Sequence, residues 1–280
     1  MNRSLHLKAP AKVNFRLDVL RRRPDGYHDL RMVMQRIDLC DDIELTLTET
    51  PGITVSCSGA PLPENRDNIV WRAAEVMAHR ADYGGGIQVR LTKRIPVAAG
   101  LGGGSSDAAS VLTGLNGLLG LNLAPAELMD IGLTLGADVP FFIFARPAIA
   151  TGIGEQLTPL DQIPSLWLLL VNPGIAVSTA WVYQNLGLTS SRVADNIPLL
   201  YQSVDDVCAI LANDLETVTI GAHPVIDDIK KQLLAAGARG ALMSGSGPTV
   251  FGIFADADTA RNAAGGFGSR GWFTAVVPTV

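Results

Sequence analysis

The sequence predicts an α+β fold in which helices lie on one face of an antiparallel sheet. Several segments alternate apolar and polar residues, which is typical of strands with one face in the core and one face in water. Other segments repeat their apolar residues at helical spacing, and the two kinds of segment follow one another in mixed order. The 280 residues, 48% hydrophobic and 18% charged, are enough for one large domain or two of ordinary size.

Strands dominate the first part of the chain, and helices follow them. Residues 5–60 read mostly as strands, and Pro51-Gly52 predicts a hairpin turn between two alternating segments, residues 43–48 and 53–57. A helix is predicted over residues 68–81, because its apolar residues share one face. The further expected elements are a strand over residues 87–93, helices over residues 105–119 and 125–136, and a buried hairpin formed by residues 141–145 and 148–152.

The second part of the chain mixes strands and helices more evenly. Its predicted strands cover residues 166–171, 240–244, 249–254 and 272–277, and its predicted helices cover residues 180–186, 204–213, 225–236 and 258–265. Between the two parts, residues 157–164 are irregular and contain Pro159 and Pro164. We therefore expect two domains, residues 1–158 and residues 159–280.

Charge and cysteine content restrict the class of protein. The net charge of −5 gives no overall positive field, so neither nucleic acid nor a membrane is an expected partner. Cys40, Cys57 and Cys208 are scattered and form no metal-binding pattern, and reduced thiols fit a cytoplasmic protein. No signal peptide is expected, because the first residues lack a sustained apolar run. We expect a monomer or a weak homodimer.

The most informative segment is glycine-rich and runs from Pro96 to Ser106. Four of the five residues 100–104 are glycines, so a ligand can approach the main chain closely. Ser105 and Ser106 are good N-cap residues for the alanine-rich helix that follows. The N–H groups of its first turn would form an anion site. The segment predicts a phosphate-binding loop for a nucleotide, and a flexible glycine loop capped by serine is the alternative.

Two familiar phosphate-binding motifs do not fit this segment. A Walker A loop needs a lysine directly after its last glycine, whereas Ser105 follows Gly104. A Rossmann fingerprint needs a third glycine where Ser105 stands, and an acidic residue about 20 positions further on. Residues 119–122 contain no acidic residue. A phosphate-binding role for this segment therefore implies a loop of another class.

Three separated segments together resemble the GHMP small-molecule kinases. They are Pro10-Ala11-Lys12-Val13-Asn14, the glycine-rich segment, and Ser244-Gly245-Ser246-Gly247-Pro248-Thr249-Val250-Phe251. The resemblance spans most of the chain. It implies a two-domain fold, with an N-terminal domain similar to domain 2 of ribosomal protein S5 and a ferredoxin-like C-terminal domain. It also implies an enzyme that uses ATP to phosphorylate an alcohol group of a small molecule.

Three segments match one branch of this family in more detail, and this narrows the range of expected substrates. The matching segments are Lys12-Val13-Asn14-Phe15, Arg23-Pro24-Asp25-Gly26-Tyr27-His28 and Gly136-Ala137-Asp138-Val139-Pro140-Phe141-Phe142. They resemble the branch of the family that phosphorylates 4-diphosphocytidyl-2-C-methyl-D-erythritol at its 2-hydroxyl, a step of the non-mevalonate route to isoprenoid precursors. The implied partner is a small molecule with a cytidine diphosphate moiety. The implied co-substrate is ATP, with Mg²⁺ expected beside the nucleotide.

Two residues are candidates for catalysis of phosphoryl transfer, which needs an oriented hydroxyl and stabilised charge. Asp138 is an acid in an apolar stretch, where a charge is costly unless it is paired or used. From the residues alone, a turn or cap aspartate is an equal alternative. Lys12 lies in an apolar strand, where a single lysine usually faces solvent. The resemblance implies instead that Asp138 is the general base and that Lys12 pairs with it.

Aromatic residues are the candidates for recognition of the cytosine base. Tyr27 and His28 follow a turn signal at Asp25-Gly26. The resemblance implies that Tyr27 stacks on cytosine, that His28 binds the edge of the base, and that Tyr183 supplies the opposite ring. Without the resemblance, Tyr27 and His28 would be interpreted as surface residues.

Two polar residues complete the expected substrate site. Asn14 lies two residues after Lys12, on the same face of the strand, and could bind the erythritol hydroxyls. Thr179 is expected to donate a hydrogen bond near the substrate. Gln184 stands where the family often has a lysine, which leaves open how the substrate diphosphate is neutralised.

The expected ATP site combines the glycine-rich segment with the start of an earlier helix. Residues 68–70 match the family segment that borders adenine, although an N-cap followed by core residues is the alternative. Residues 244–248 form a second small-residue loop that supports the active site in the family, or a plain turn between strands. No protein ligand of Mg²⁺ stands out. The implied ATP-binding residues are Asn68, Ile69, Val70, Pro96, Val97, Ala98, Ala99, Gly100, Leu101, Gly102, Gly103, Gly104, Ser105 and Ser106.

Three other functions are alternatives to the ATP-dependent phosphorylation of the cytidine diphosphate compound. A family member that acts on homoserine, mevalonate or a sugar would not need Asp25-Gly26-Tyr27-His28 for a cytosine. A non-catalytic nucleotide-binding regulator would be favoured if Lys12 or Asp138 were missing, and both are present. An NAD oxidoreductase is disfavoured by the failed Rossmann pattern.

Overall fold

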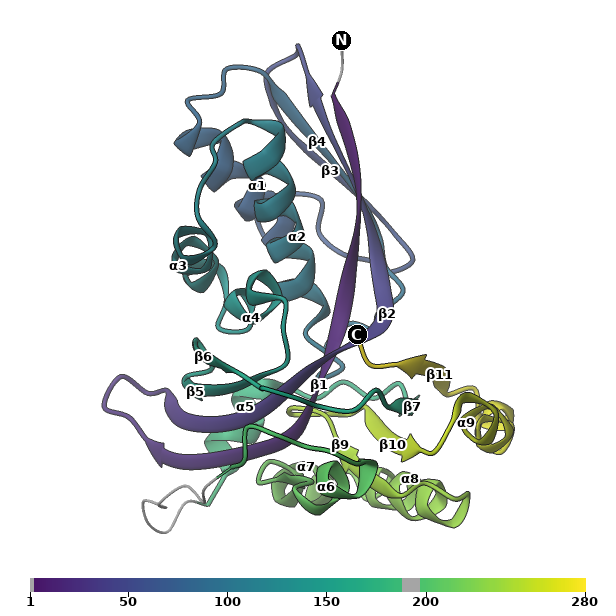
Figure 1. The fold of residues 1–280 in the computed structure, drawn as a ribbon. Coiled ribbons are helices and arrows are strands. Elements are labelled where there is room, and N and C mark those ends of the chain that lie inside the picture. The colour runs from purple at the N-terminus through teal and green to yellow at the C-terminus, as the bar shows by residue number, and fades with distance from the viewer. Residues whose placement is uncertain (1–2, 188–196) are drawn as a thin grey trace. The chain divides into compact units, whose positions relative to one another are not determined.

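The computed structural model describes residues 3–187 and 197–280 of the chain (Figure 1). The chain forms two compact units that interleave along the sequence. Unit 1 combines Met1–Ala11, Leu39–Val97 and Gly102–Ala145, and unit 2 combines Lys12–Asp38, Ala98–Leu101 and Arg146–Val280. Because no single chain position separates the units, the predicted boundary between residues 158 and 159 stays a prediction.

Two long strands contribute to both units. They are β1 (Ser4–Arg22), which begins in unit 1, and β2 (His28–Thr48), which ends there. In unit 1 the strand order is β3-β4-β2-β1, with β3 at Gly52–Ser58 and β4 at Gly86–Thr92. β4 pairs antiparallel with β2 and parallel with β3.

The predicted hairpin between residues 43–48 and 53–57 is wrong. Both segments are strands, but β4 lies between them and pairs with each. Alternation of apolar and polar residues determines which face of a strand is buried, and it does not determine which strand becomes the neighbour.

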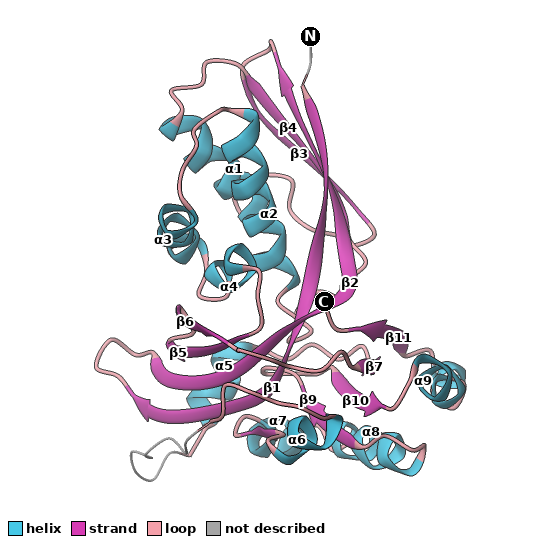
Figure 2. Cartoon of the chain, viewed as in Figure 1, coloured by secondary structure: helices cyan, strands magenta, loops and turns pink. Residues whose placement is uncertain are grey.

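Helices cover one side of the strands in unit 1, as predicted (Figure 2). They are α1 (Ile69–Arg80), α2 (Gly103–Leu118), α3 (Pro125–Leu135) and α4 (Val139–Phe144). At Gly114 helix α2 lies so close to the strands that an added Cβ would lie 2.6 Å from Leu45 and 2.7 Å from Leu7. The first turn of α2 is thereby held at the end of a well-packed helix.

Helix α4 replaces a predicted strand. Residues 141–145 were expected to form a buried hairpin with residues 148–152, but they are helical up to Phe144. Pro140 stands in the first turn, where its fixed φ suits a helix, and Ala145 ends the helix with a left-handed φ of 59°. A short apolar run does not by itself distinguish a buried strand from a buried helix.

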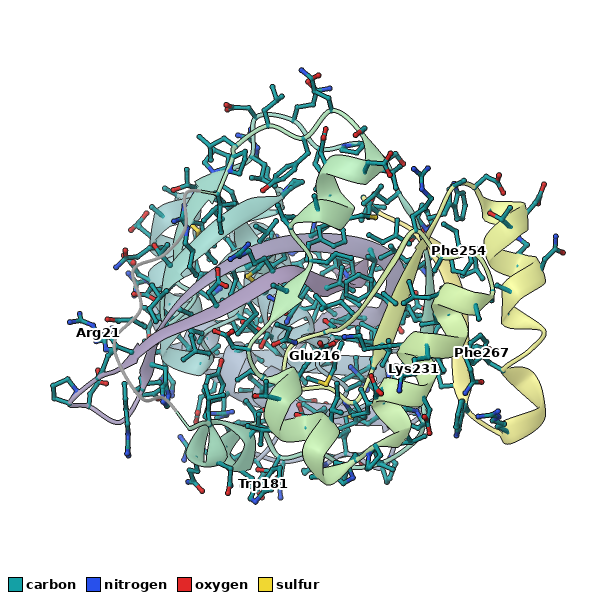
Figure 3. All side chains as sticks on the ribbon, turned by 90° about the horizontal axis from the view of Figure 1, so that it is seen from below. Arg21, Trp181, Glu216, Lys231, Phe254 and Phe267 are labelled. Carbon is teal, nitrogen blue, oxygen red and sulfur yellow. The ribbon has the colours of Figure 1, made fainter. Side chains whose placement is uncertain are left out.

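In unit 2, a four-stranded antiparallel sheet has the order β11-β7-β10-β9. Its strands lie close to the predicted positions, and helices α8 and α9 pack against them. Phe254 of β10 and Phe267 are both buried in this part of the core (Figure 3). The bounds are β7 Trp167–Asn172, β9 Gly240–Met243, β10 Val250–Phe254, β11 Phe273–Pro278, α8 Val225–Ala235 and α9 Ala257–Ala264.

The remaining strands of unit 2 extend β1 and β2. β5 (Ala148–Gly152) pairs antiparallel with β2 and with β6 (Gln156–Pro159), and β8 (Ala212–Asn213) pairs parallel with β1. Phe15 of β1 packs edge-on against Phe251 of β10, with ring centroids 5.8 Å apart. This contact joins β1 to the four-stranded sheet within unit 2.

Short helices complete unit 2. They are α5 (Thr179–Asn185), α6 (Val204–Ala209), α7 (Glu216–Ala222) and a 3₁₀ turn at Gly268–Arg270. The predicted helix over residues 204–213 is too long, because the chain becomes extended in β8, and α7 was not predicted. Within the described ranges, every helix is too short or too polar to cross a membrane.

Candidate active site

The glycine-rich segment leads into helix α2, which begins earlier than predicted. α2 starts at Gly103, and Gly102 occupies the cap position with a left-handed φ of 69°, which glycine adopts without strain. Ser105 and Ser106 lie inside the first turn, so the prediction that they cap the helix is wrong. The first N–H groups of a helix have no acceptor within it. The anion-binding character of this turn therefore comes from the backbone.

Two of the three residues expected near adenine have structural roles in unit 1. Asn68 caps α1: its Oδ1 accepts a hydrogen bond from the Val70 N–H at 3.1 Å, and its Nδ2 donates to the Pro63 carbonyl at 2.7 Å. Val70 is fully buried. Ile69 differs, because a Cβ added to Gly104 would lie 3.8 Å from its Cγ2. Ile69 thus borders the first turn of α2, and the contact of these residues with adenine stays a prediction.

A cluster of three buried charges next to this turn was not predicted. Lys93 donates to Asp107 Oδ2 at 2.7 Å and to Asp41 Oδ2. Burial raises the pKa of Asp107 to about 7, although Lys93 opposes the shift. Asp107 directly follows the glycine-rich segment, and this position is a signal that could have been used. Asp41 lies in β2 and Lys93 directly follows β4, and nothing in the sequence distinguishes either from a surface residue.

Lys12 and Asn14 lie side by side in unit 2. The Lys12 Nζ donates to Asn14 Oδ1 at 2.6 Å, and Asn14 Nδ2 donates to Met32 Sδ at 3.4 Å. Lys12 is 4% exposed and Asn14 is fully buried. The interpretation of Lys12 as a solvent-facing strand lysine is therefore wrong, and the predicted common face of the two residues is confirmed.

The loop of residues 244–248 packs against the glycine-rich segment and Lys12 within unit 2. Ser244 Oγ donates to the Gly100 carbonyl at 2.9 Å. Gly100 has a φ of +75°, and a Cβ there would collide with the Ser244 carbonyl oxygen. A Cβ on Gly245 would lie 3.5 Å from Lys12 Nζ. The loop thus brings main-chain atoms next to the candidate catalytic ammonium, which a plain turn would not need to do.

Other side chains of unit 2 hold this loop in place. Asn213 Nδ2 donates to the carbonyl oxygens of Met243 and Gly245, each at 2.8 Å. Glu216, in helix α7 (Figure 3), accepts a hydrogen bond from the Met243 N–H at 2.8 Å. These bonds explain why β8 replaces the end of the predicted long helix: the extended backbone at Asn213 places its amide at the loop.

Thr179 also reaches this loop. It is the first residue of α5, and its Oγ1 lies 2.8 Å from Ser246 Oγ. Thr219 Oγ1 donates to the Ser246 carbonyl oxygen at 3.2 Å. Thr179 therefore links α5 to the small-residue loop, and its contact with substrate stays a prediction.

The aromatic candidates are placed differently from one another. His28 and Tyr183 stack on each other, with ring centroids 5.1 Å apart and an interplanar angle of 26°. Tyr27 is 58% exposed. Burial, helped by the charge of Arg22, lowers the pKa of His28 below its usual value, so the imidazole is neutral at pH 7. A neutral imidazole offers one hydrogen-bond donor and one acceptor, which suits the edge of a base.

Asp138 occupies the cap position of α4 in unit 1. Its side chain is half-buried and makes no capping hydrogen bond, so a cap does not account for it. Asp138 belongs to unit 1 and Lys12 belongs to unit 2, and their pairing stays a prediction. Within unit 2 the structure brings together Lys12, Asn14, Gly100 and the loop of residues 244–248.

Comparisons with known proteins agree on one family. The model of the GHMP kinases N terminal domain matches residues 68–146, and that of the GHMP kinases C terminal domain matches residues 196–271. The chain is 60% identical over 278 residues to a protein of Geobacter sulfurreducens named 4-diphosphocytidyl-2-C-methyl-D-erythritol kinase, covering 99% of this chain and 100% of the relative. A protein of the same name from Geobacter metallireducens is 61% identical over 276 residues, 98% of each chain.

Solved structures show the same likeness. The crystal structure of a 4-(cytidine 5'-diphospho)-2C-methyl-D-erythritol kinase matches with a TM-score of 0.82 and 35% identity, covering 98% of this chain and 99% of the other. Homoserine kinase from Cytophaga hutchinsonii matches with a TM-score of 0.74 at 19% identity, over 99% and 94% of the two chains. The second likeness shows a shared fold.

Proposed function

The chain belongs to the GHMP kinase family, and we propose that it transfers the γ-phosphoryl group of ATP to the 2-hydroxyl of 4-diphosphocytidyl-2-C-methyl-D-erythritol. The reaction is a step of the non-mevalonate route to isoprenoid precursors. The observation that carries the proposal is the identity of about 60%, over nearly the whole chain, with relatives that bear this enzyme's name. Tyr27 and His28 support the same substrate, because the alcohol substrate of a homoserine, mevalonate or sugar kinase contains no nucleobase.

The nucleotide phosphates are proposed to bind at the first turn of α2. The N–H groups at Gly103 and Gly104 lack acceptors within the helix, and the helix dipole favours negative charge there. Gly104 is exposed, so phosphate oxygens can approach its main chain without a side chain in the way. Ile69 borders this turn and is proposed to contact the nucleotide.

Asp138 and Lys12 are proposed to catalyse the transfer. Asp138 takes the proton of the 2-hydroxyl, the hydroxyl oxygen forms a bond to the γ-phosphorus, and the bond from that phosphorus to the β,γ-bridging oxygen breaks to release ADP. Lys12 stabilises the negative charge of the transferring group. Its ammonium is held by Asn14 beside Gly245, and this fixed position lets it act without further reorganisation.

Tyr27, His28 and Tyr183 are proposed to recognise the cytosine. The exposed ring of Tyr27 can stack on the base, and the neutral imidazole of His28 can hydrogen-bond its edge. Tyr183 is proposed to supply the ring on the opposite side of the base, and its stacking on His28 also orients the imidazole. Asn14 and Thr179 are proposed to bind polar groups of the erythritol and diphosphate parts.

Mg²⁺ is proposed to arrive with ATP and to be held mainly by the nucleotide. Within the described ranges, no group of three or more histidine, cysteine, aspartate or glutamate side chains could hold a metal ion. The donor set therefore does not fit a metal centre built by the protein alone, and no step of the proposed mechanism depends on one.

An ATP-consumption assay across a panel of acceptors tests the proposed function. The panel holds 4-diphosphocytidyl-2-C-methyl-D-erythritol, mevalonate, homoserine and galactose, and the purified chain is expected to consume ATP with the first compound alone. Consumption with another acceptor would assign the chain to a different branch of the family. Binding of ATP without consumption with any of them would favour a regulatory protein.

A further inference from the structure

Unit 1 contains three buried charges that the proposed mechanism does not use. Asp41, Lys93 and Asp107, here called the triad, have side chains that are 0%, 4% and 2% exposed. Lys93 bridges the two carboxylates. Buried ion pairs are often no more stabilising than well-packed apolar residues of the same size. The triad therefore calls for a role besides stability.

The triad connects both ends of the glycine-rich segment. Asp41 Oδ1 accepts hydrogen bonds from the N–H groups of Arg94 at 2.6 Å and Ile95 at 2.9 Å, where the chain enters the segment. At the other end, Asp107 lies near the start of α2 and accepts from Lys93. The Lys93 Nζ also lies 3.2 Å from where a Cβ on Gly103 would be. One ammonium thus ties the entry of the segment to its exit.

We propose that the triad is a positioning device for ATP, which clamps both ends of the glycine-rich segment so that the first-turn N–H groups of α2 are in place before the nucleotide binds. The inference rests on the proposed function, because it takes ATP as the ligand. A segment whose ends are fixed loses less conformational freedom on binding, and this lowers the cost of binding. Asp107 acts through α2, and it is a positioning residue.

A matched pair of variants separates the effect of the Lys93–Asp107 hydrogen bond from the effect of the negative charge of Asp107. Asp107→Leu and Asp107→Asn have side chains of similar size, and both remove the negative charge. Only the asparagine keeps an oxygen that can accept the hydrogen bond from Lys93. Lys93 stays paired with Asp41 in both variants. A difference in ATP binding between them therefore reports the hydrogen bond and not the electrostatic field.

The KM for ATP and the Kd of a non-hydrolysable ATP analogue are the measurements. Asp107→Leu is expected to raise both by about tenfold relative to Asp107→Asn, the size of effect that loss of a charge-assisted hydrogen bond produces. The KM for the alcohol substrate should not change. Leu112→Ala, a fully buried position on the same helix, serves as the control. It should lower the midpoint of thermal unfolding without changing the KM for ATP.

Equal ATP binding by the two Asp107 variants, with both folded, would overturn the inference. So would a raised KM for ATP in Leu112→Ala, because general loosening of α2 would then be enough. If Asp107→Leu does not fold, the double variant Lys93→Met, Asp107→Leu removes the whole bridge, and an unchanged Kd there also overturns the clamp. Analogue binding by calorimetry needs no alcohol substrate, so the clamp is tested even if the proposed substrate fails in the turnover assay.

Discussion

The loop of residues 244–248 in unit 2 and the first turn of α2 in unit 1 are both rich in glycine and serine, yet they are held in opposite ways. Ser244 Oγ donates to Gly100, Ser246 Oγ meets Thr179, and the carbonyl of Gly245 accepts from Asn213. In the first turn of α2, by contrast, the Oγ of Ser106 is buried and has no hydrogen-bond partner among the described residues.

This difference separates a supporting loop from a ligand-binding one. A buried hydroxyl without a partner costs about 1–3 kcal/mol, and folded proteins keep few such groups. The loop of residues 244–248 uses its polar groups within the fold, so its variants should act mainly on stability. The first turn of α2 keeps polar groups unused, so its variants should act mainly on ATP binding and turnover.

The largest expected effect tests the transfer step that the α2 turn is proposed to serve. Asp138→Asn and Lys12→Met should each lower kcat by about 10²–10⁴-fold, as loss of a general base or its partner does. ATP binding, measured by calorimetry, should persist. If the two residues act as one unit, the double variant should be little slower than the slower single one. Near-normal turnover in folded Asp138→Asn would remove it as the base.

Two glycines offer a direct contrast between the loops. Gly100→Ala should lower the free energy of unfolding by more than about 1 kcal/mol, because its φ is +75° and its Cβ would collide with Ser244. Gly104→Ala has room, since the nearest atom to its Cβ is 3.8 Å away, in Ile69. It should leave stability unchanged or raised, and weaken ATP binding about tenfold or more. Normal ATP affinity in Gly104→Ala would contradict the α2 turn as the phosphate site.

The same contrast between free and engaged groups applies to the two tyrosines of the proposed cytosine site. Tyr27→Ala should weaken substrate binding by roughly 1–3 kcal/mol, the usual worth of a base–aromatic stack, without loss of stability. Tyr183→Ala should affect both, because Tyr183 stacks on His28. Calorimetry with the cytidine substrate and thermal unfolding separate the two effects. Unchanged substrate affinity in Tyr27→Ala would exclude Tyr27 from the site.

The smallest expected effects come from a serine in each loop. Ser244→Ala should lower the free energy of unfolding by about 0.5–1.5 kcal/mol, because it removes the hydrogen bond to Gly100. Ser106→Ala removes a hydroxyl that has no partner among the described residues, so stability should stay the same or rise. The KM for ATP should rise in Ser106→Ala only. Denaturant unfolding and ATP kinetics are measured on both variants. Equal losses of unfolding free energy would contradict the distinction between the loop of residues 244–248 and the first turn of α2.

Much of the strand pattern could be predicted, because alternation and apolar runs report burial directly. The strands β7, β9, β10 and β11 lie close to their predicted positions for this reason. The partner of β3 and the helical state of α4 were missed. Both depend on contacts with distant parts of the chain, which a local pattern does not contain.

The candidate site was predicted unevenly for the same physical reason. Lys12 was placed in the site through its resemblance to a family motif, since a lysine in an apolar strand looks alike whether it is buried or exposed. Asp41, in β2, and Lys93, just after β4, were missed because each looks ordinary in the sequence and forms the cluster only through contacts with the other and with Asp107. Polar clusters that assemble across several elements leave no periodic signal in the sequence.

The interleaving of the two units has a consequence for how the chain folds during synthesis. All segments of unit 1, with the α2 turn and the triad, have been made once Ala145 leaves the ribosome. Lys12, made much earlier, lacks its neighbour Gly245 until most of the chain is complete. At synthesis rates of about 5–20 residues per second, the nascent chain spends roughly ten to fifty seconds with this pairing unmade. Unit 2 depends on this contact between segments far apart in the sequence, so its assembly is expected to limit the rate at which active protein appears.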